Sequence, residues 1–397
     1  MIIRSYYLEK LLALRNAEYI KIITGIRRCG KSTLLKMLKN HLISQEHIAE
    51  NRIIEINYEK FQFDELRNSR KLNEYIASKI ISNELYYLFI DEIQELPQWP
   101  RIINGLRASG NIDIYVTGSN SRVFSGEHLT YISGRYTELK VFPLSFGEFK
   151  TFSNIEDNNS AFNDYLRIGS FPALAITDNE AQREAISSGL FDSIFSRDIL
   201  LRGKIRDEGK FFRIAKFIGD GIGSQMSVNS IMNTLKSQGY KISAETIDNY
   251  ITLMCKSFLL YSCERYDIRG KDILRTNGKL YMADLGLRNQ LMGYKTGNIG
   301  HQIENLVYLE LLRQGYEVYV GKLDNKEIDF IATQNNTKIY VQVAMTALDE
   351  NTLIRELDPF YKIKDNYRKV LITADTIDLS RDGIEHINLY DFLSTIK

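Results

Sequence analysis

The first 150 residues alternate between short, largely apolar runs and segments whose apolar residues recur at helical spacing. Residues 19–24 and 85–90 are runs of the first kind, and each ends in polar residues, as strands of a buried parallel sheet often do. Residues 34–38 and 72–81 instead place apolar side chains every three or four positions, like one face of a helix. We therefore predict an α/β domain with a parallel sheet over residues 1–150.

Helical patterning dominates the middle of the chain, residues 151–295. Three successive helices are predicted there, at 211–218, 227–235 and 243–254. Two short strands follow, near 259–265 and 278–282, and they flank a charged turn. Three helices followed by a hairpin with basic residues predict a winged helix-turn-helix.

The last part of the chain, residues 296–397, mixes one amphipathic helix with several strands. The helix is predicted at 301–313, and strands are predicted to begin near residues 316, 327 and 338. This order predicts a second α/β domain at the C-terminal end. The whole chain is therefore predicted to be an α/β protein in three parts, at 1–150, 151–295 and 296–397.

Composition places the chain among globular proteins, because 44% of its 397 residues are hydrophobic and 25% are charged. A net charge of +1 gives no overall electrostatic signal for nucleic acid or for a membrane. The three cysteines form no C-x-x-C pair, which gives no disulfide or metal framework and suits a reducing compartment. The N-terminus does not resemble a signal peptide, and no run of 18 apolar residues predicts a spanning helix. We expect a cytoplasmic protein.

One segment carries a specific chemical signal. Residues 25–33 follow the pattern G-x-x-x-x-G-K-[ST], between a predicted strand and a predicted helix. Glycines let the backbone turn so that its N–H groups surround phosphate oxygens, and the helix dipole adds positive charge there. Lysine can reach the β- and γ-phosphates, and a serine hydroxyl can ligate Mg²⁺. The predicted nucleotide-binding residues are Gly25, Ile26, Arg27, Arg28, Cys29, Gly30, Lys31, Ser32 and Thr33.

Two carboxylates end the apolar run at 85–90 and fit the second half of such a site. Asp91 is predicted to hold Mg²⁺ together with Ser32, directly or through water. Glu92 is predicted to orient and activate the attacking water as a general base. The alternative is a buried strand followed by a solvated turn.

Further candidates follow the next strand. Residues 112–121 break into small polar residues, so that Ser119 or Asn120 could contact the γ-phosphate or the attacking water, or could simply form a turn. Arg135 follows a glycine and could stabilise the charge that develops in phosphoryl transfer, as an arginine finger does, or could be a surface residue. Arg27 and Arg28 compete with Arg135 for that role.

These segments together resemble one protein family. Residues 25–33, 89–94, 116–120, 133–135 and 143–149 are similar, in order and spacing, to bacterial and archaeal AAA+-type P-loop ATPases. Members of this family carry an uncharacterised C-terminal region with a winged helix and a restriction-endonuclease-like domain. The resemblance implies ATP rather than GTP as the nucleotide, and it favours Arg135 as an arginine finger.

DNA binding is an open alternative for the winged helix. Thr246 and Asn249 on the predicted recognition helix could read base edges, but Glu245 and Asp248 would repel phosphate. A basic wing is predicted from Arg265, Arg269, Lys271, Arg275 and Lys279. A winged helix that packs against protein is the other interpretation. The positive charge of the predicted wing is moderate and does not decide between DNA binding and protein packing.

The C-terminal order of helix and strands resembles the core of PD-(D/E)XK nucleases, which need a helix Glu, a strand Asp and a Glu-x-Lys on the next strand. Glu304 and Asp329 match that pattern. The third position instead reads Gln342-Val343-Ala344, which lacks both the carboxylate and the lysine. We therefore predict a degenerate nuclease-like domain without cleavage activity.

Three functions are compatible with these residues. The first is a Mg²⁺-dependent ATPase that acts as a nucleotide-driven regulatory switch toward a protein partner. The second is a DNA-processing or defence ATPase that uses the winged helix, and the third is a nucleotide-binding scaffold with negligible turnover. In the first two, Lys31, Glu92, Asn120 and Arg135 are the predicted catalytic residues. If Arg135 acts from a neighbouring subunit, the protein is expected to form a homo-oligomer.

Overall fold

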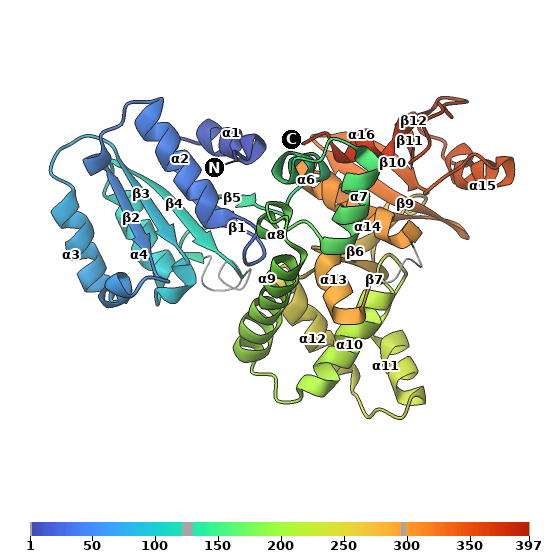
Figure 1. The fold of residues 1–397 in the computed structure, drawn as a ribbon, viewed down its shortest axis with the longest axis horizontal. Helices are drawn as coiled ribbons and strands as arrows, with labels where there is room; N and C mark the ends of the chain where they lie inside the picture. The colour runs from blue at the N-terminus through green and yellow to red at the C-terminus, as the bar shows by residue number, and fades with distance from the viewer. Residues whose placement is uncertain (1, 121–129, 295–298, 397) are drawn as a thin grey trace. The chain divides into compact units, whose positions relative to one another are not determined.

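The computed structural model describes residues 2–120, 130–294 and 299–396 (Figure 1). By its internal contacts the chain divides into two compact units. Unit 1 comprises residues 1–142 together with 256–258, and unit 2 comprises residues 143–255 and 259–397. We describe each unit by itself.

Unit 1 is built around a five-stranded sheet with the order β2-β3-β4-β1-β5 (Figure 1). All of its strand pairs are parallel, as the alternation of strands and helices predicts. Its strands are β1 (Ile20–Thr24), β2 (Ile53–Asn57), β3 (Tyr86–Asp91), β4 (Ile112–Gly118) and β5 (Tyr136–Lys140). Its helices include α1 (Ser5–Ala13), α2 (Lys31–Ser44), α3 (Ser69–Lys79) and α4 (Trp99–Ala108), with short 3-10 turns at Glu50–Arg52, Phe61–Arg67 and Ile93–Glu95.

The core of unit 1 lies along its central strands. Every residue of β1 and of β3 is buried, because helices cover a parallel sheet on both faces. Ile22, Leu88 and Val116 have no exposed surface at all, and they belong to one apolar cluster. Since the carboxyl ends of parallel strands lie on one edge of a sheet, the residues that follow β1, β3 and β4 are brought to that edge.

Unit 2 contains a seven-stranded mixed sheet with the order β12-β11-β10-β9-β8-β6-β7. Its strands are β6 (Leu260–Asp267), β7 (Asp272–Met282), β8 (Glu317–Leu323), β9 (Lys326–Gln334), β10 (Thr337–Val343), β11 (Arg368–Thr373) and β12 (Ile384–Asn388). The pairs β6–β7, β8–β9 and β9–β10 are antiparallel, whereas β6–β8, β10–β11 and β11–β12 are parallel.

The helices of unit 2 come in two runs. Those before the sheet are α6 (Phe146–Ser153), α7 (Asn158–Ile168), α8 (Pro172–Ala175), α9 (Glu180–Asp192), α10 (Glu208–Asp220), α11 (Val228–Ser237) and α12 (Ala244–Lys256), and a π-helix at Ser193–Leu201 extends α9. Those within or after it are α13 (Leu285–Met292), α14 (Ile299–Gln314), α15 (Glu350–Tyr361) and α16 (Leu389–Leu393). None of the helices in the described part of the chain combines the length and the hydropathy needed to cross a bilayer.

The predicted winged-helix elements occur in the expected order, as α10, α11, α12 and the hairpin β6–β7. The hairpin strands are longer than predicted, and β6 also pairs with β8, with Arg265 opposite Val320. The expected wing is thus continuous with the C-terminal sheet. A strand's own pattern does not specify its second neighbour, so this pairing could not be read from residues 260–267. The three-part division of the chain stays a prediction.

The turn after α7 is explained by packing within unit 2. Gly169 has a φ of +85°, and a Cβ there would lie 2.4 Å from Asp284 Oδ1. The main-chain N–H and the hydroxyl of Ser170 both donate to Asp284 Oδ2, at 2.5 and 2.7 Å. Asp284 in turn caps α13 by accepting from the Leu287 N–H. The glycine and serine of this turn therefore have a structural reason.

Candidate nucleotide-binding site

The loop of residues 25–30 connects β1 to α2 and has an unusual backbone. Gly25, Arg28 and Gly30 have φ values of +142°, +67° and +107°. A Cβ on Gly25 would lie 2.1 Å from the main-chain oxygen of Val141, so only glycine fits this position. The loop leads into the first turn of the 14-residue helix α2, where free N–H groups and the helix dipole favour an anion. This backbone is a cradle that a phosphate group fits.

The Lys31 side chain lies over this loop and is only 4% exposed. Its Nζ donates to the main-chain oxygens of Gly25 and Ile26, at 2.9 and 3.0 Å. Both acceptors are neutral carbonyl groups, so the positive charge of Lys31 is hydrogen-bonded without being neutralised by them. A cation held in this way at a helix N-terminus suits the binding of phosphate.

Two side chains in the middle of the loop, those of Arg27 and Cys29, face other partners. Arg27 is buried, and its Nη2 lies 2.7 Å from Glu59 Oε1. The Cys29 thiol donates to the main-chain oxygen of Val141 at 3.3 Å. Arg28 is exposed. The loop residues 26–29 therefore offer a ligand their backbone more than their side chains.

Asp91 ends β3 on the same edge of the sheet. Its Oδ1 accepts from the Thr117 hydroxyl at 2.5 Å, and its Oδ2 accepts from Asn57 Nδ2 at 2.9 Å. Burial raises the pKa of Asp91, while hydrogen bonds from the hydroxyls of Thr117 and Ser32 oppose that rise. The structure thus brings together Ser32 and Asp91, the two predicted metal ligands.

Glu92 has a left-handed backbone, with φ +57° and ψ +52°, which is uncommon for a residue other than glycine. Its N–H donates to Thr117 Oγ1 at 3.0 Å. Its Oε2 accepts from the Ser119 hydroxyl at 3.3 Å and also from Gln94 Nε2. The side chain is only 7% exposed, so a carboxylate is held in a defined place beside Asp91.

Thr117 was not singled out from the sequence, yet its hydroxyl connects Asp91 with the Glu92 backbone. The signal was present, because Thr117 lies near the end of β4, in the predicted polar segment that contains Ser119. Asn120 follows on the same edge and is buried. Its contact with phosphate or water stays a prediction, and residues 121–129 lie outside the described part of the chain.

Arg135 lies at the amino ends of the strands, opposite the carboxyl ends that carry the residue 25–30 loop. β5 runs parallel to β1, with Tyr136 opposite Ile20 and Lys140 opposite Thr24. Arg135 therefore comes just before the Tyr136–Ile20 pair. The loop of residues 25–30, here called the phosphate loop, comes just after the Lys140–Thr24 pair. Five strand residues at about 3.3 Å each separate the two ends by roughly 16 Å. Its Nη1 instead donates to Asn104 Oδ1 at 3.4 Å. An arginine-finger role for Arg135 would have to be exerted on a second copy of the chain.

A second group of carboxylates lies in unit 2, where the nuclease-like pattern predicts it. Glu304 Oε1 is 2.8 Å from Lys279 Nζ and accepts from the Tyr281 hydroxyl at 2.6 Å. Asp329 Oδ2 accepts from the Val343 N–H at 2.9 Å, and Gln342 Oε1 accepts from the Asp329 N–H at 2.7 Å. Asp329 thus contacts Gln342 directly, and it lies near enough to Glu304 for the two carboxyl groups to affect each other. The nuclease-like reading of these residues stays a prediction.

Lys279 is the residue that the nuclease-like pattern missed. It comes from β7, is 3% exposed, and lies 2.7 Å from Glu327 Oε1 as well as 2.8 Å from Glu304. Burial alone would lower the pKa of Lys279, but Glu304, Asp329 and Glu327 together outweigh that effect and raise it. Burial and Glu304 raise the pKa of Asp329 to about 8. Among the described residues, no set of three or more acidic, histidine or cysteine side chains could hold a metal ion.

Three family models match successive parts of the chain. Residues 17–150 match the model of an AAA domain, which agrees with the resemblance to P-loop ATPases. Residues 159–298 and 299–392 match two domains of unknown function, DUF8612 and DUF4143. The solved structure of a Walker-type ATPase from Pyrococcus abyssi is similar at 16% identity, over 73% of this chain and 96% of that chain, with a TM-score of 0.48.

Two curated relatives match over most of their length. An uncharacterised protein of Methanocaldococcus jannaschii is 29% identical over 94% of this chain and 85% of its own. An uncharacterised protein of Haemophilus influenzae is 41% identical over 99% of this chain and 98% of its own. The chain therefore belongs to the family of this Haemophilus influenzae protein, and it carries a P-loop AAA domain followed by two domains of unknown function.

Proposed function

We propose that the protein is a Mg²⁺-dependent ATPase whose nucleotide cycle acts as a regulatory switch. The observation that carries the proposal is the meeting of Lys31, Ser32, Asp91 and Glu92 at one edge of the unit 1 sheet. Asp91 and Ser32 share a hydrogen bond, and Lys31 lies over a loop with the backbone of an anion cradle.

Each residue has a separate role in this proposal. Lys31 and the backbone of residues 25–33 would hold the phosphates, and Ser32 with Asp91 would hold Mg²⁺, which supplies charge neutralisation at the phosphates. Glu92 would accept a proton from the attacking water. The contacts of its Oε2 with Ser119 and Gln94 favour this role, because they fix the carboxylate in one orientation.

The acidic composition of the α12 surface favours a switch over a DNA-processing enzyme. Glu245, Asp248 and Asn249 are all exposed on the helix that would enter the major groove. Two carboxylates on that surface would repel the DNA backbone. Of the predicted basic wing, Lys279 is buried among carboxylates, Arg269 pairs with Asp324 at 2.6 Å, and the side chain of Arg275 lies outside the described residues.

The second carboxylate group adds to this preference. Glu304 and Glu327 are both paired with Lys279, which offsets one of their two negative charges and holds both side chains in an ion-pair network inside the protein. A nuclease needs carboxylates that bind a catalytic metal. Unit 2 is therefore proposed to respond to the nucleotide state and to contact a protein partner, without cutting DNA.

The test is an assay of ATP binding and phosphate release by the full chain with Mg²⁺. The Lys31→Ala variant should lose ATP binding, with affinity at least about a hundredfold weaker, because both the charge and its contact with the β- and γ-phosphates are removed. The Lys36→Ala variant, one turn further along α2, is the matched control and should bind like the natural protein. Unchanged ATP affinity in Lys31→Ala would overturn the assigned site.

The same assay separates the alternative functions. Stimulation of phosphate release by duplex DNA that weakens with salt would favour the DNA-processing alternative. Tight ATP binding without phosphate release would favour a nucleotide-binding scaffold. Constant ATPase rates at all DNA concentrations support the switch.

The place of Arg135 makes oligomerisation part of the proposal. If Arg135 acts on a second copy, the rate per subunit should rise with protein concentration, and Arg135→Ala should lower the rate without weakening ATP binding. Light scattering with and without a non-hydrolysable ATP analogue measures the assembly. A monomer in both states, with a constant rate per subunit, would exclude this role.

A further inference from the structure

The chain leaves unit 1 next to the phosphate loop. Val141 follows β5, and its N–H donates to the main-chain oxygen of Thr24 at 2.8 Å. Its own oxygen accepts from the Cys29 thiol at 3.3 Å and is the atom that excludes a side chain at Gly25. Residue 141 is thus in direct contact with both ends of the loop, and the peptide of residues 141–145, here called the exit peptide, starts there.

Arg4 joins the loop and the exit peptide through a single guanidinium group. Its Nη1 donates to the main-chain oxygen of Cys29 at 2.8 Å, and its Nη2 donates to that of Phe142 at 3.0 Å. Arg4 is 2% exposed, and its guanidinium carbon lies 4.5 Å from the centre of the Tyr7 ring. The Tyr7 hydroxyl also accepts from the Phe142 N–H, at 3.2 Å. The segment before β1 therefore braces the loop.

The contact with Cys29 affects the direction of a neighbouring donor. In a trans peptide the C=O and the N–H of the same plane point in opposite directions. No cis peptide occurs among the described residues, so the Gly30 N–H points away from the Cys29 oxygen and hence away from Arg4. Arg4 thereby fixes the orientation of an amide in the part of the loop that would surround phosphate.

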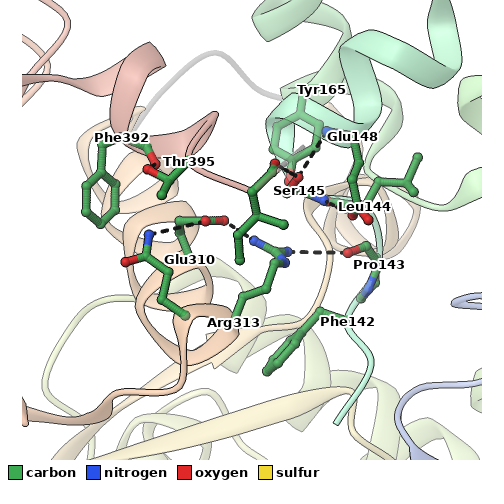
Figure 2. A network of polar contacts seen from close by, with 12 residues as sticks. Phe142, Pro143, Leu144, Ser145, Glu148, Tyr165, Glu310, Arg313, Phe392 and Thr395 are labelled. Carbon is green, nitrogen blue, oxygen red and sulfur yellow. Dashed lines mark hydrogen bonds and ion pairs between the residues drawn. The ribbon is translucent and has the colours of Figure 1, made fainter. Parts of the chain in front are cut away.

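The exit peptide continues into unit 2, where a second set of side chains holds it (Figure 2). The Pro143 oxygen accepts from Arg313 Nη2 at 3.3 Å, and the Leu144 oxygen accepts from the Tyr165 hydroxyl at 2.8 Å. The Ser145 hydroxyl donates to the Ile396 oxygen at 2.6 Å. Arg313 is paired with Glu310, and both side chains of this pair are buried in α14.

Two arginines from different units therefore hold successive carbonyl groups of the exit peptide. Arg4 holds residue 142 in unit 1, and Arg313 holds residue 143 in unit 2. A guanidinium is a planar fork of charged donors, so each contact restrains its carbonyl more strongly than a neutral donor would. A change in the loop at Cys29 has a short route, through Arg4 and the peptide bond between Phe142 and Pro143, into unit 2.

We propose that Arg4 is a positioning residue of the ATPase site that couples the phosphate loop to the exit peptide, so that nucleotide binding is transmitted to α14 of unit 2. This inference rests on the proposed function, because it assumes that the loop binds ATP. Arg4 touches no reacting atom. It acts by fixing the Cys29 and Phe142 carbonyl groups together.

The test combines nucleotide affinity with hydrogen exchange in the full chain. A fluorescent ADP analogue measures affinity, and mass spectrometry follows exchange in peptides covering residues 143–150 and 304–316, with and without a saturating non-hydrolysable ATP analogue. The natural protein should show nucleotide-dependent changes in both peptides. Arg4→Ala should bind nucleotide about tenfold more weakly, and at saturation it should lose most of the change in both peptides.

Two further variants guard against a merely structural effect. Arg4→Lys keeps the charge but can no longer present two N–H groups in a fixed plane, so it should retain more affinity than Arg4→Ala while still losing most of the transmitted change. Arg101→Ala removes an exposed arginine on α4 and should match the natural protein in both measurements. The double variant Glu310→Gln/Arg313→Gln removes a buried charge pair together and should keep nucleotide affinity while uncoupling residues 304–316.

The outcomes separate this inference from the proposed function. If the natural protein binds no ATP, the proposed function fails and the inference fails with it. If the natural protein binds ATP but Arg4→Ala and Arg4→Lys keep full affinity and the full exchange response, only the role of Arg4 is overturned. If nucleotide binds but changes no hydrogen exchange in residues 143–150 or 304–316 of the natural protein, the proposed transmission to unit 2 is overturned and the proposed function stands.

Discussion

Each unit of this protein holds a buried lysine beside a group of carboxylates, and the two groups differ in what that lysine contacts. In unit 1, Lys31 donates to the carbonyl oxygens of Gly25 and Ile26, while Asp91 and Glu92 accept from hydroxyl and amide groups. In unit 2, Lys279 lies within 2.8 Å of Glu304 and within 2.7 Å of Glu327.

The difference determines what each group can still bind. Neutral hydrogen-bond partners satisfy the geometry of a charged group without cancelling its charge, so Lys31 and the carboxylates of unit 1 can still attract phosphate and a cation. In unit 2 the lysine is shared by two carboxylates, and a metal ion would have to displace it. Similar residue types therefore form a candidate reaction site in one unit and an internal ion-pair network in the other.

Removal of divalent cations should produce the largest contrast between the two groups. We expect EDTA to abolish phosphate release, because Ser32 and Asp91 are proposed to hold Mg²⁺, and added Mg²⁺ should restore it. The melting temperature of the protein without nucleotide should change by less than about 1 °C, since Lys279 already occupies the space between Glu304 and Glu327 in unit 2. A melting temperature that rises with Mg²⁺ in the natural protein but not in Asp329→Asn would contradict the contrast.

Substitution of one carboxylate in each unit tests whether only the unit 1 group takes part in ATP hydrolysis. Glu92→Gln should lower kcat by about 10³-fold with little change in ATP affinity, because the amide cannot accept the proton of the attacking water. Glu304→Gln is the matched variant in unit 2 and should leave kcat within about twofold. Steady-state kinetics and equilibrium binding measure both. A Glu92→Gln protein with full turnover would refute the assigned base.

Loss of the lysine in unit 2 should affect stability and spare nucleotide binding. Lys279→Ala leaves Glu304 and Glu327 without their common partner, and we expect the free energy of unfolding of unit 2 to fall by about 3 kcal/mol. Urea unfolding measures this change. Lys236→Ala, at an exposed position of α11, is the control and should shift stability by less than about 0.5 kcal/mol. Equal stabilities of the two variants would show that the network contributes little.

The smallest expected effect concerns pH. The pKa of Asp329 is raised to about 8, so between about pH 4 and pH 8 the folded state holds a proton that the unfolded state releases. This contribution to stability is full below about pH 4 and is lost as the pH rises toward 8. Since Asp329 keeps some exposure, we expect a loss of about 1 kcal/mol.

Asp329→Asn removes this proton and can still accept a hydrogen bond from the Val343 N–H. Its stability relative to the natural protein should therefore rise between pH 5 and pH 8, as followed by urea unfolding at several pH values. Parallel pH profiles for the two proteins would show that Asp329 keeps its ordinary pKa.

Local patterns predicted the parts of the molecule that depend on neighbours in sequence. The alternation of apolar runs predicted the parallel sheet of unit 1, and nine consecutive residues predicted the loop between β1 and α2. Ser32 and Asp91 share a hydrogen bond, because each motif comes at the carboxyl end of its strand and parallel strands bring those ends together. Their role as metal ligands stays a prediction.

Contacts between distant residues could not be predicted in the same way. Arg4 has no motif around it, and only the folded chain places its guanidinium against Cys29 and Phe142. Lys279 was read as part of a basic wing, because nothing in residues 271–282 indicates that β7 turns this side chain toward Glu304. The sequence shows that position 344 holds alanine where the nuclease pattern has lysine, but it does not show that Lys279, on another strand, lies against Glu304.

The close approach at Gly25 has a consequence for how relatives of this protein can diverge. The atom that a Cβ would meet is a main-chain oxygen, that of Val141, and every residue type carries that atom. A substitution elsewhere could not make room, as it could if a side chain were in the way. Descendants that abandoned ATP would be free to replace Lys31, yet they should keep the glycine. Within this family, retention of Gly25 would therefore report an intact fold, whereas retention of Lys31 would report the proposed nucleotide site.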